Sequence, residues 1–109
     1  MRIAMPIVEN KGKDSEIAQH FGHVQFIVVY DSESNELKVM DVKNVEGCSP
    51  VAAIENENID IIYCFGMGMR AVELCKAKGI KLKTGQFKTV NEVINNLDKL
   101  EDLEESCGH

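Results

Sequence analysis

The sequence predicts a mixed α/β domain built around a five-stranded sheet. Three runs of strand-forming residues come first, at 2–9, 24–31 and 36–43, and two more, at 59–65 and 80–85, alternate with helix patterns. Strands joined by short turns pair antiparallel, whereas strands joined through helices pair parallel. We therefore expect three mainly antiparallel strands, followed by parallel strands whose helices cover the faces of the sheet.

The chain has 109 residues, the size of one domain, and its 12 basic and 18 acidic residues give a formal net charge of -6. No segment combines clustered basic residues with aromatic ones, which argues against nucleic acid as a partner. No apolar run approaches the roughly 18 to 20 residues that span a bilayer, and the first residues lack a signal-peptide pattern. We therefore expect a cytoplasmic protein without membrane contact, whose four cysteines are thiols or ligands rather than disulfides.

The first strand, at residues 2–9, is almost continuously apolar, as in strands that are covered on both faces. Pro6 removes one backbone donor from it, which indicates a bulge or a sheet edge at that point. Residues 11–22 predict a loop with a short helical turn, capped by Asp14 or Ser15, in which Ile17, Ala18 and Phe21 have helical spacing.

The second and third strands, at 24–31 and 36–43, are predicted to form a hairpin, because the turn-forming residues 32–35 separate them. In the third strand the apolar residues change faces after Val39. A bulge and burial on both sides both explain this change.

The second half alternates helices and strands. Ser49 and Pro50 are typical of a helix cap and first helical position, so a helix is expected after Cys48. A buried strand follows at 59–65, then a glycine turn and a helix within 66–79, and another strand at 80–85 that completes a right-handed crossover.

The last helix is predicted within residues 89–103, where Thr89 and Glu92 fit a capping box. Its apolar stripe is expected to pack on the sheet. The polar residues 104–109 are expected to fray. The stripe consists of Val90, Val93, Ile94, Leu97 and Leu100.

His20 and His23 are the first candidate functional residues. Imidazole is a common ligand for transition metals, and two rings three residues apart on a turn can point into one space. The simpler alternative is one loop histidine and one surface histidine, with Phe21 in the core.

The turn from Gly66 to Arg70 is the second candidate, because it follows a buried strand and precedes a helix. Open α/β sheets bind ligands beyond the carboxyl ends of their parallel strands, and a helix N-terminus offers free N–H groups to an anion. Gly66, Gly68 and Ala71 also fit a dinucleotide pattern, but no acidic residue follows about 20 positions later, so a dinucleotide is not favoured.

Two cysteines are candidate metal ligands. Cys64 lies at the end of the buried strand, where a ligand and a small core residue are equally plausible. Cys48 precedes the helix cap, where the helix dipole lowers the pKa of a thiol. Cys75 fits core packing, whereas Cys107 and His109 form a tail that could fold onto a metal or hang in solvent.

Three stretches of the sequence resemble the dinitrogenase iron-molybdenum cofactor biosynthesis family, which includes small stand-alone members in archaea and bacteria. They are "MRIAMPIVEN", "SEIAQHFGHVQFIVVYD" and "CFGMGMRAVELCKAKGIKL", and the resemblance extends from Met1 to about Leu97. It implies a ribonuclease H-like α/β fold in one cofactor-biosynthesis-like domain, residues 1–100, followed by an acidic flexible tail, 101–109. The implied function is to bind or carry an iron-sulfur-based cofactor or its precursors, not to act as an enzyme.

The resemblance also bears on individual residues. His20, Phe21 and Gly22 match the family's His-Phe-Gly element, and Gly66, Gly68 and Ala71 match its glycine turn. Many members have arginine at the position of His23, so this residue fits an anion contact as well as a metal ligand. Many also lack cysteine at the position of Cys64.

Together, these observations predict one site in which the histidine loop and the glycine turn face each other across the carboxyl ends of the central strands. An iron-sulfur or iron-molybdenum type cluster would bind there transiently, delivered to or from metallocluster assembly or acceptor proteins, and a homodimer is left open. The predicted cofactor-binding residues are His20, Phe21, Gly22, His23, Gly66, Met67, Gly68 and Arg70. The predicted metal ligands are His20, His23, Cys48 and Cys64.

Two alternative functions are weighed against this prediction. A metal-dependent nuclease or phosphohydrolase on a ribonuclease H-like scaffold needs converging carboxylates, but the first strand offers Arg2, Ile3, Met5 and Ile7 where such enzymes carry a catalytic aspartate. A regulatory module that binds a small anion or a partner protein at the glycine turn, without metal, is the other alternative.

Overall fold

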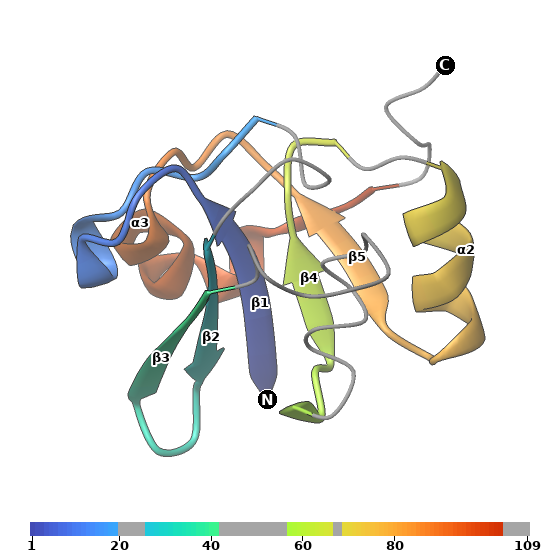
Figure 1. Ribbon diagram of the computed structural model, residues 1–109, viewed down its shortest axis with the longest axis horizontal. Coiled ribbons are helices and arrows are strands. Elements are labelled where there is room, and N and C mark those ends of the chain that lie inside the picture. Colours follow the sequence, from blue (N-terminus) through green and yellow to red (C-terminus); the bar gives the residue numbers. More distant parts are fainter. Residues whose placement is uncertain (20–25, 42–56, 67–68, 104–109) are drawn as a thin grey trace.

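The structure of the chain is a computed structural model that describes residues 1–19, 26–41, 57–66 and 69–103 (Figure 1). Its strands are β1 (Arg2–Ile7), β2 (Phe26–Asp31), β3 (Glu36–Asp41), β4 (Ile61–Tyr63), β5 (Lys81–Thr84) and β6 (Glu101–Asp102). Its helices are α2 (Met69–Ala77) and α3 (Val90–Asn95), with 3₁₀ turns η1 (Gly12–Asp14) and η4 (Leu97–Lys99). No helix in these ranges is long and apolar enough to cross a membrane.

The described strands form one sheet in the order β3-β2-β1-β4-β5-β6. β1 pairs antiparallel with β2 and parallel with β4, β2 and β3 form the predicted hairpin, and β4 and β5 are parallel. The mixed α/β class, with antiparallel strands first and parallel strands later, is therefore confirmed.

The predicted number of five strands is wrong, because β6 adds a sixth strand antiparallel to β5. Glu101 and Asp102 were expected at the start of a flexible acidic tail. Their backbone instead pairs with β5, the ammonium of Lys83 bonds to the Asp102 carboxylate, and the Leu103 N–H donates to the Leu82 carbonyl at 3.0 Å. The lysine on β5 thus offsets the charge that made this segment look like a solvated tail.

Each face of the sheet is covered by one described helix, and Figure 1 shows α2 and α3 at opposite sides of the molecule. Side chains alternate along a strand, so β1 supplies both faces. α3 packs on the sheet as predicted, but the helix predicted within residues 89–103 is too long: it ends at Asn95, and η4 and β6 follow it. The α3 face buries Ile3, Met5, Ile7, Ile17, Val28, Tyr30, Ile61, Tyr63, Val90 and Val93. The α2 face buries Ala4, Ile27, Val29, Ile59, Ile62, Cys64, Cys75, Ile80 and Leu82.

Pro6 lies inside β1, opposite Ile27 of β2, and not in an edge strand. β4 pairs with β1 only at Ile3 and Ala4, and the Pro6 carbonyl accepts a hydrogen bond from the Ala18 N–H at 2.9 Å. The missing N–H of Pro6 therefore costs no bond to β4, because β4 has already ended there.

Residues 16–18 fill the place beside β1 that β4 leaves. Ile17 forms an antiparallel bridge with Ile7, and Glu16 forms one with Thr89. The predicted helical turn through Ile17 is therefore wrong: a short turn exists, but earlier, as η1. Tertiary pairing with the exposed backbone of β1 overrides the helical spacing of the apolar residues.

Two other local predictions can be compared with the structure. The pairing of β2 with β3 runs without a bulge, so the change of faces in β3 reflects burial on both sides: Val39 packs on the α3 face and Met40 on the α2 face.

Thr89 caps α3 by accepting from the Glu92 N–H at 3.2 Å, and the Glu92 carboxylate accepts from the Lys88 N–H at 2.8 Å. The helix predicted after Ser49 lies outside the described residues.

Candidate functional site

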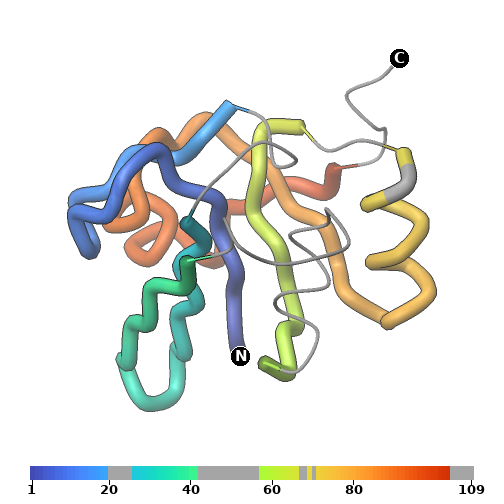
Figure 2. Tube along the Cα trace, viewed as in Figure 1, coloured from blue at the N-terminus to red at the C-terminus, as the bar shows by residue number. Residues whose placement is uncertain are grey.

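The parallel strands β1, β4 and β5 end at the same edge of the sheet. Residues 8–19, 64–66 and 85–89 leave the strands there, and Figure 2 shows the last residues of the first segment and both others along the top of the molecule. We call these three segments the carboxyl-end rim. Ligands of open α/β sheets bind beyond such strand ends.

A cavity of about 360 Å³ opens at the carboxyl-end rim. The described residues that line it are Gln19, Phe65, Gln86 and Lys88, contributed by the segments that follow β1, β4 and β5. Gln19 is the residue before His20, and Phe65 is the residue before Gly66. The two segments predicted to form the site therefore begin at the same cavity.

Tyr63 holds the rim segment after β5 in place. Its hydroxyl donates to the Phe87 carbonyl at 2.8 Å and accepts from the Phe87 N–H at 3.1 Å, and its side chain is completely buried. Burial raises the pKa of Tyr63 to about 12. A Cβ on Gly85 would lie 3.3 Å from the Phe87 ring and 3.5 Å from the Tyr63 hydroxyl, so the turn is tightly packed. The rim is thus preorganised around one buried phenol.

Phe65 is oriented by the same tyrosine. The two rings are 5.9 Å apart between centroids with an interplanar angle of 72°, the edge-to-face arrangement that aromatic pairs favour. Tyr63 therefore contacts Phe65, which lines the cavity, and Phe87, which lies between the lining residues Gln86 and Lys88.

Lys88 brings a cation to the cavity. Its backbone is fixed on both sides, because its N–H donates to the Glu92 carboxylate and its carbonyl accepts from the Ile17 N–H at 2.8 Å. The side chain is exposed, and no ion pair within the described part of the chain involves its ammonium group. The charge is available to an anionic ligand.

The structure describes three of the predicted site residues. Gly66 is buried at the rim, Arg70 lies in the first turn of α2, and Cys64 is completely buried. The other predicted residues lie outside the described ranges, so their grouping stays a prediction. These are His20, Phe21, Gly22, His23, Cys48, Met67 and Gly68.

Cys64 lies in the apolar cluster under α2, and its N–H donates to the Lys83 carbonyl at 3.1 Å. These surroundings are those of a small core residue. Cys75 belongs to the same cluster, which confirms its expected packing role, and burial raises the pKa of its thiol to about 11.

The part of the chain that the structure describes contains no group of three or more histidine, cysteine, aspartate or glutamate residues that could hold a metal ion. β1 contains neither aspartate nor glutamate, and its side chains from Ile3 to Ile7 are buried. The nuclease alternative therefore gains no carboxylate from this strand.

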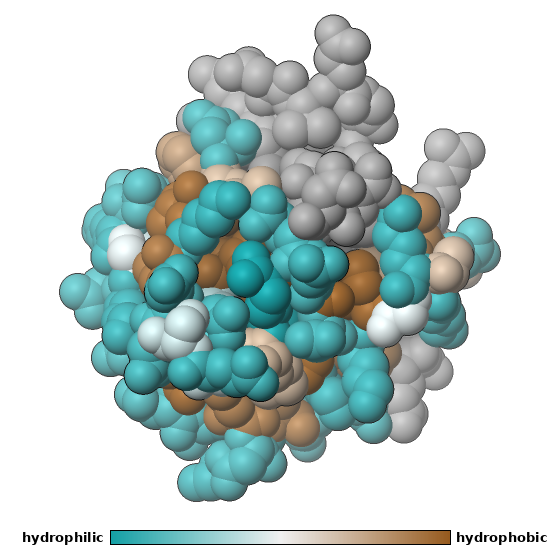
Figure 3. Space-filling model, turned by 90° about the horizontal axis from the view of Figure 1, so that it is seen from below, coloured by the Kyte–Doolittle hydropathy of each residue, from teal (hydrophilic) through white to brown (hydrophobic). Residues whose placement is uncertain are grey.

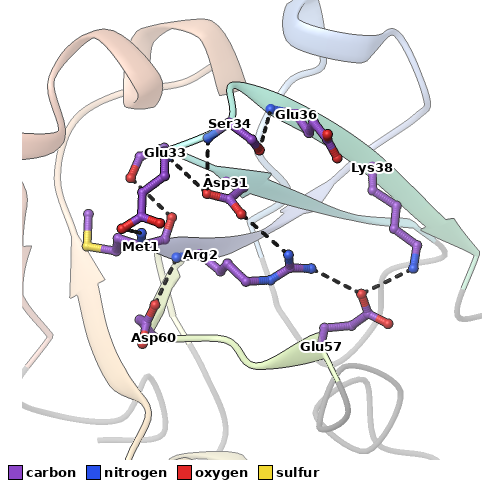
Figure 4. Close-up of polar contacts among 10 residues, drawn as sticks. Met1, Arg2, Asp31, Glu33, Ser34, Glu36, Lys38, Glu57 and Asp60 are labelled. Carbon is purple, nitrogen blue, oxygen red and sulfur yellow. Dashed lines mark hydrogen bonds and ion pairs between the residues drawn. The ribbon is translucent and has the colours of Figure 1, made fainter.

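The opposite end of the molecule carries a network of charges around Arg2 (Figure 4). Its guanidinium lies 3.6 Å from the Asp31 carboxylate and 3.3 Å from that of Glu57, which also accepts from Lys38 at 3.1 Å. The Glu33 N–H bond to Asp31 lowers the pKa of that carboxyl. Seen from below, this end is covered mainly by hydrophilic side chains (Figure 3). The network joins β1, β2 and β3 to the segment before β4.

Sequence reasoning missed the residues that line the cavity. Phe65 ends the predicted strand at 59–65, and Gln86 and Lys88 follow the predicted strand at 80–85, so the rule that ligands bind at carboxyl ends could have pointed to them. Gln19 had no such signal, because its position depends on the pairing of residues 16–18 with β1.

Solved structures with the same fold cover nearly the whole chain. The crystal structure of PH0822 is 27% identical, with a TM-score of 0.81 over 96% of this chain and 98% of its own. The NMR structure of a Thermotoga protein, named as a candidate NifB protein of the DUF35 family, is 25% identical, with a TM-score of 0.80 over 95% of this chain and 94% of its own. The apo orange protein from Desulfovibrio gigas is 18% identical and alike in fold, with a TM-score of 0.84 over 96% and 94%.

No curated protein sequence matches this chain significantly. The family model described as dinitrogenase iron-molybdenum cofactor matches residues 1–100. The chain therefore belongs to the dinitrogenase iron-molybdenum cofactor family.

Proposed function

We propose that this protein binds and carries an iron-sulfur-based metal cofactor, of the iron-molybdenum type or a precursor of it, without catalysing a reaction. The family of the chain supports the cofactor class. The observation that carries the proposal is the cavity lined by Gln19 and Phe65, because these residues lead directly into the histidine loop and the glycine turn.

The binding chemistry combines direct ligands with local positive charge. His20 and His23 supply imidazoles, Cys48 supplies a thiolate, and the N–H groups at the start of α2 face the same edge of the sheet. Lys88 places an ammonium at the cavity, which offsets the negative charge of the cluster in a chain whose net charge is -6. Because only a few side chains ligate the cluster, the protein should bind it weakly, as a carrier that passes its cluster to another protein must.

Cys64 and Arg70 have different parts in this proposal. Cys64 ligates the cluster only if the apolar cluster under α2 opens, because its side chain is completely buried there. Arg70 starts the same helix and contributes a second cation to the anionic cargo.

Metallocluster assembly proteins and cluster acceptors are the partners this role requires. We also assign the fold to the ribonuclease H-like class. The order β3-β2-β1-β4-β5, with β2 antiparallel to both of its neighbours, supports this assignment.

Anaerobic titration with a purified iron-sulfur cofactor tests the proposal. We expect His20→Ala and His23→Ala each to weaken binding by about tenfold or more, since losing even an indirect contact to a metal ligand costs that much. Asn95→Ala, at an exposed position of α3 outside the carboxyl-end rim, is the control and should bind like the wild type. Unchanged affinity in both loop variants would remove the histidines from the site.

The metal content of protein purified without oxygen distinguishes the carrier from the regulatory alternative. Bound iron or molybdenum supports the carrier. A colourless, metal-free protein that binds simple anions at the rim and tolerates air supports the regulatory module.

A further inference from the structure

A second cavity, of about 480 Å³, lies between the last turn of α2 and the edge of the sheet formed by β5 and β6. We call it the lysine groove. Lys76 and Lys81 are exposed in it, and the buried apolar side chains of Ile80 and Leu82 also line it. It therefore combines positive charge with an apolar surface.

The lysine groove differs in charge from the molecule as a whole. Residues 76–83, "KAKGIKLK", contain four of the 12 basic residues of the chain and no acidic residue. The whole chain carries 18 acidic residues and a net charge of -6. An acidic partner would be repelled by the molecule on average but attracted to this one groove.

The chain itself shows which kind of segment the groove accepts. β6 is an extended, acidic segment that pairs with β5, and the Asp102 carboxylate bonds to Lys83. Leu103 lines the groove and packs against the apolar cluster under α2. The hydrogen bond from Lys83, together with the charges of Lys83 and Lys81, lowers the pKa of Asp102. One side of the lysine groove is therefore already occupied by an acidic segment of the chain, in which Asp102 pairs with a lysine and Leu103 packs between strand and helix.

We propose that the lysine groove docks an extended, acidic segment of a partner protein, with an apolar side chain among its carboxylates, against Lys76 and Lys81 as β6 lies against Lys83. The carboxylates would pair with the exposed ammonium groups, and the apolar side chain would cover Ile80 and Leu82. The groove uses α2 and β5, and among the described residues it shares no lining residue with the cavity at the carboxyl-end rim. The inference therefore does not depend on cofactor binding.

Fluorescence anisotropy with three labelled peptides tests this inference. EDLEDLEE has both features, QNLQNLQQ lacks the charges, and EDSEDSEE lacks the leucines. We expect the wild-type protein to bind EDLEDLEE most tightly, with an affinity that falls as salt is added. Lys76→Glu/Lys81→Glu should weaken this binding by about tenfold, because each exposed ion pair contributes up to about 1 kcal/mol.

Lys11→Glu/Lys13→Glu is the matched control, since it makes the same change in net charge at exposed lysines in and beside η1. We expect it to bind EDLEDLEE within about twofold of the wild type, because long-range repulsion between exposed charges is screened by salt. Circular dichroism of both double variants should match the wild type, because all four side chains are exposed.

Five results would overturn the inference. The first four are absence of binding by the wild type at low salt, equal binding of the neutral peptide, equal effects of the two double variants, and equally tight binding of duplex DNA with the same variant sensitivity. A dimer in sedimentation analysis that dissociates in Lys76→Glu/Lys81→Glu would also overturn it, because a second copy of the chain would then occupy the groove.

Discussion

Replacing Tyr63 by phenylalanine tests whether one buried hydroxyl holds the carboxyl-end rim. The hydroxyl makes two hydrogen bonds to the backbone of Phe87, at 2.8 and 3.1 Å. Tyr63→Phe removes both and leaves the N–H and carbonyl of Phe87 without these partners. Each such group costs about 1 kcal/mol or more, so we expect the free energy of unfolding to fall by about 2 kcal/mol.

Urea unfolding followed by circular dichroism measures this change, and Tyr30→Phe is its control. The Tyr30 hydroxyl bonds to the side chain of Asn35, which is exposed, so water replaces the lost bond. We expect a loss of about 0.5 kcal/mol for the control. Equal losses in the two variants would refute the argument that Tyr63 has a special role.

The wild type and Tyr63→Phe should also differ in how their free energy of unfolding depends on pH. The folded state raises the pKa of Tyr63 from its ordinary value of 10.0 to about 12, because burial disfavours the phenolate. The neutral phenol therefore favours the folded state fully below pH 10, and this contribution is lost as pH rises towards 12. The wild type should lose stability over this range relative to Tyr63→Phe, by roughly 1.4 kcal/mol per pH unit at most. A constant difference between the two proteins from pH 9 to 12 would contradict it.

Three further predictions concern other residues. Thr89→Ala removes the cap of α3 and should lower the free energy of unfolding by about 1 kcal/mol, which urea unfolding measures; a loss below about 0.3 kcal/mol would show that the cap is not needed. Cys64 and Cys75 are completely buried and should resist alkylation at pH 8 until urea unfolds the protein, as peptide mass spectrometry would show; rapid labelling of either one would contradict their core positions. Lys88→Ala should weaken binding of an anionic cluster about fivefold, whereas Lys99→Ala, at an exposed lysine in η4 outside the carboxyl-end rim, should leave anaerobic titrations unchanged, and equal effects would mean that only net charge matters.

Local patterns predicted much of this fold because the structure uses the interactions from which those patterns arise. The hairpin of β2 and β3 follows from a short polar turn between two apolar runs, and Thr89 caps α3 through the hydroxyl that the sequence suggested. In both cases the pattern lies within a short stretch of sequence. The predicted apolar stripe also meets the sheet, although Leu97 and Leu100 lie beyond the end of α3 at Asn95.

Predictions failed where distant segments decide the conformation. Glu16 and Ile17 are extended because β1 and Thr89 offer backbone partners from elsewhere in the chain. Asp102 joins the sheet because Lys83, on β5, offsets its charge. The spacing of apolar residues along the sequence predicts neither result, because both depend on which backbone groups the edges of the sheet leave unpaired.

In the candidate site, too, the sequence predicted the residues that follow from local patterns and missed those that depend on distant segments. The family resemblance and the rule for parallel strand ends both direct attention to the rim, and Gly66 lies there. Gln19 was missed because its place at the cavity depends on the pairing of residues 16–18 with β1.

The most direct test of the account is to locate the cluster on the protein by NMR. With an iron-sulfur cofactor in a paramagnetic state, we predict that the backbone amide signals of the residues lining the rim cavity broaden first: Gln19, Phe65, Gln86 and Lys88. Signals from Arg2 and Glu57, in the charge network at the other end of the sheet, should stay sharp. Broadening confined to that end, with an unaffected rim, would contradict the account.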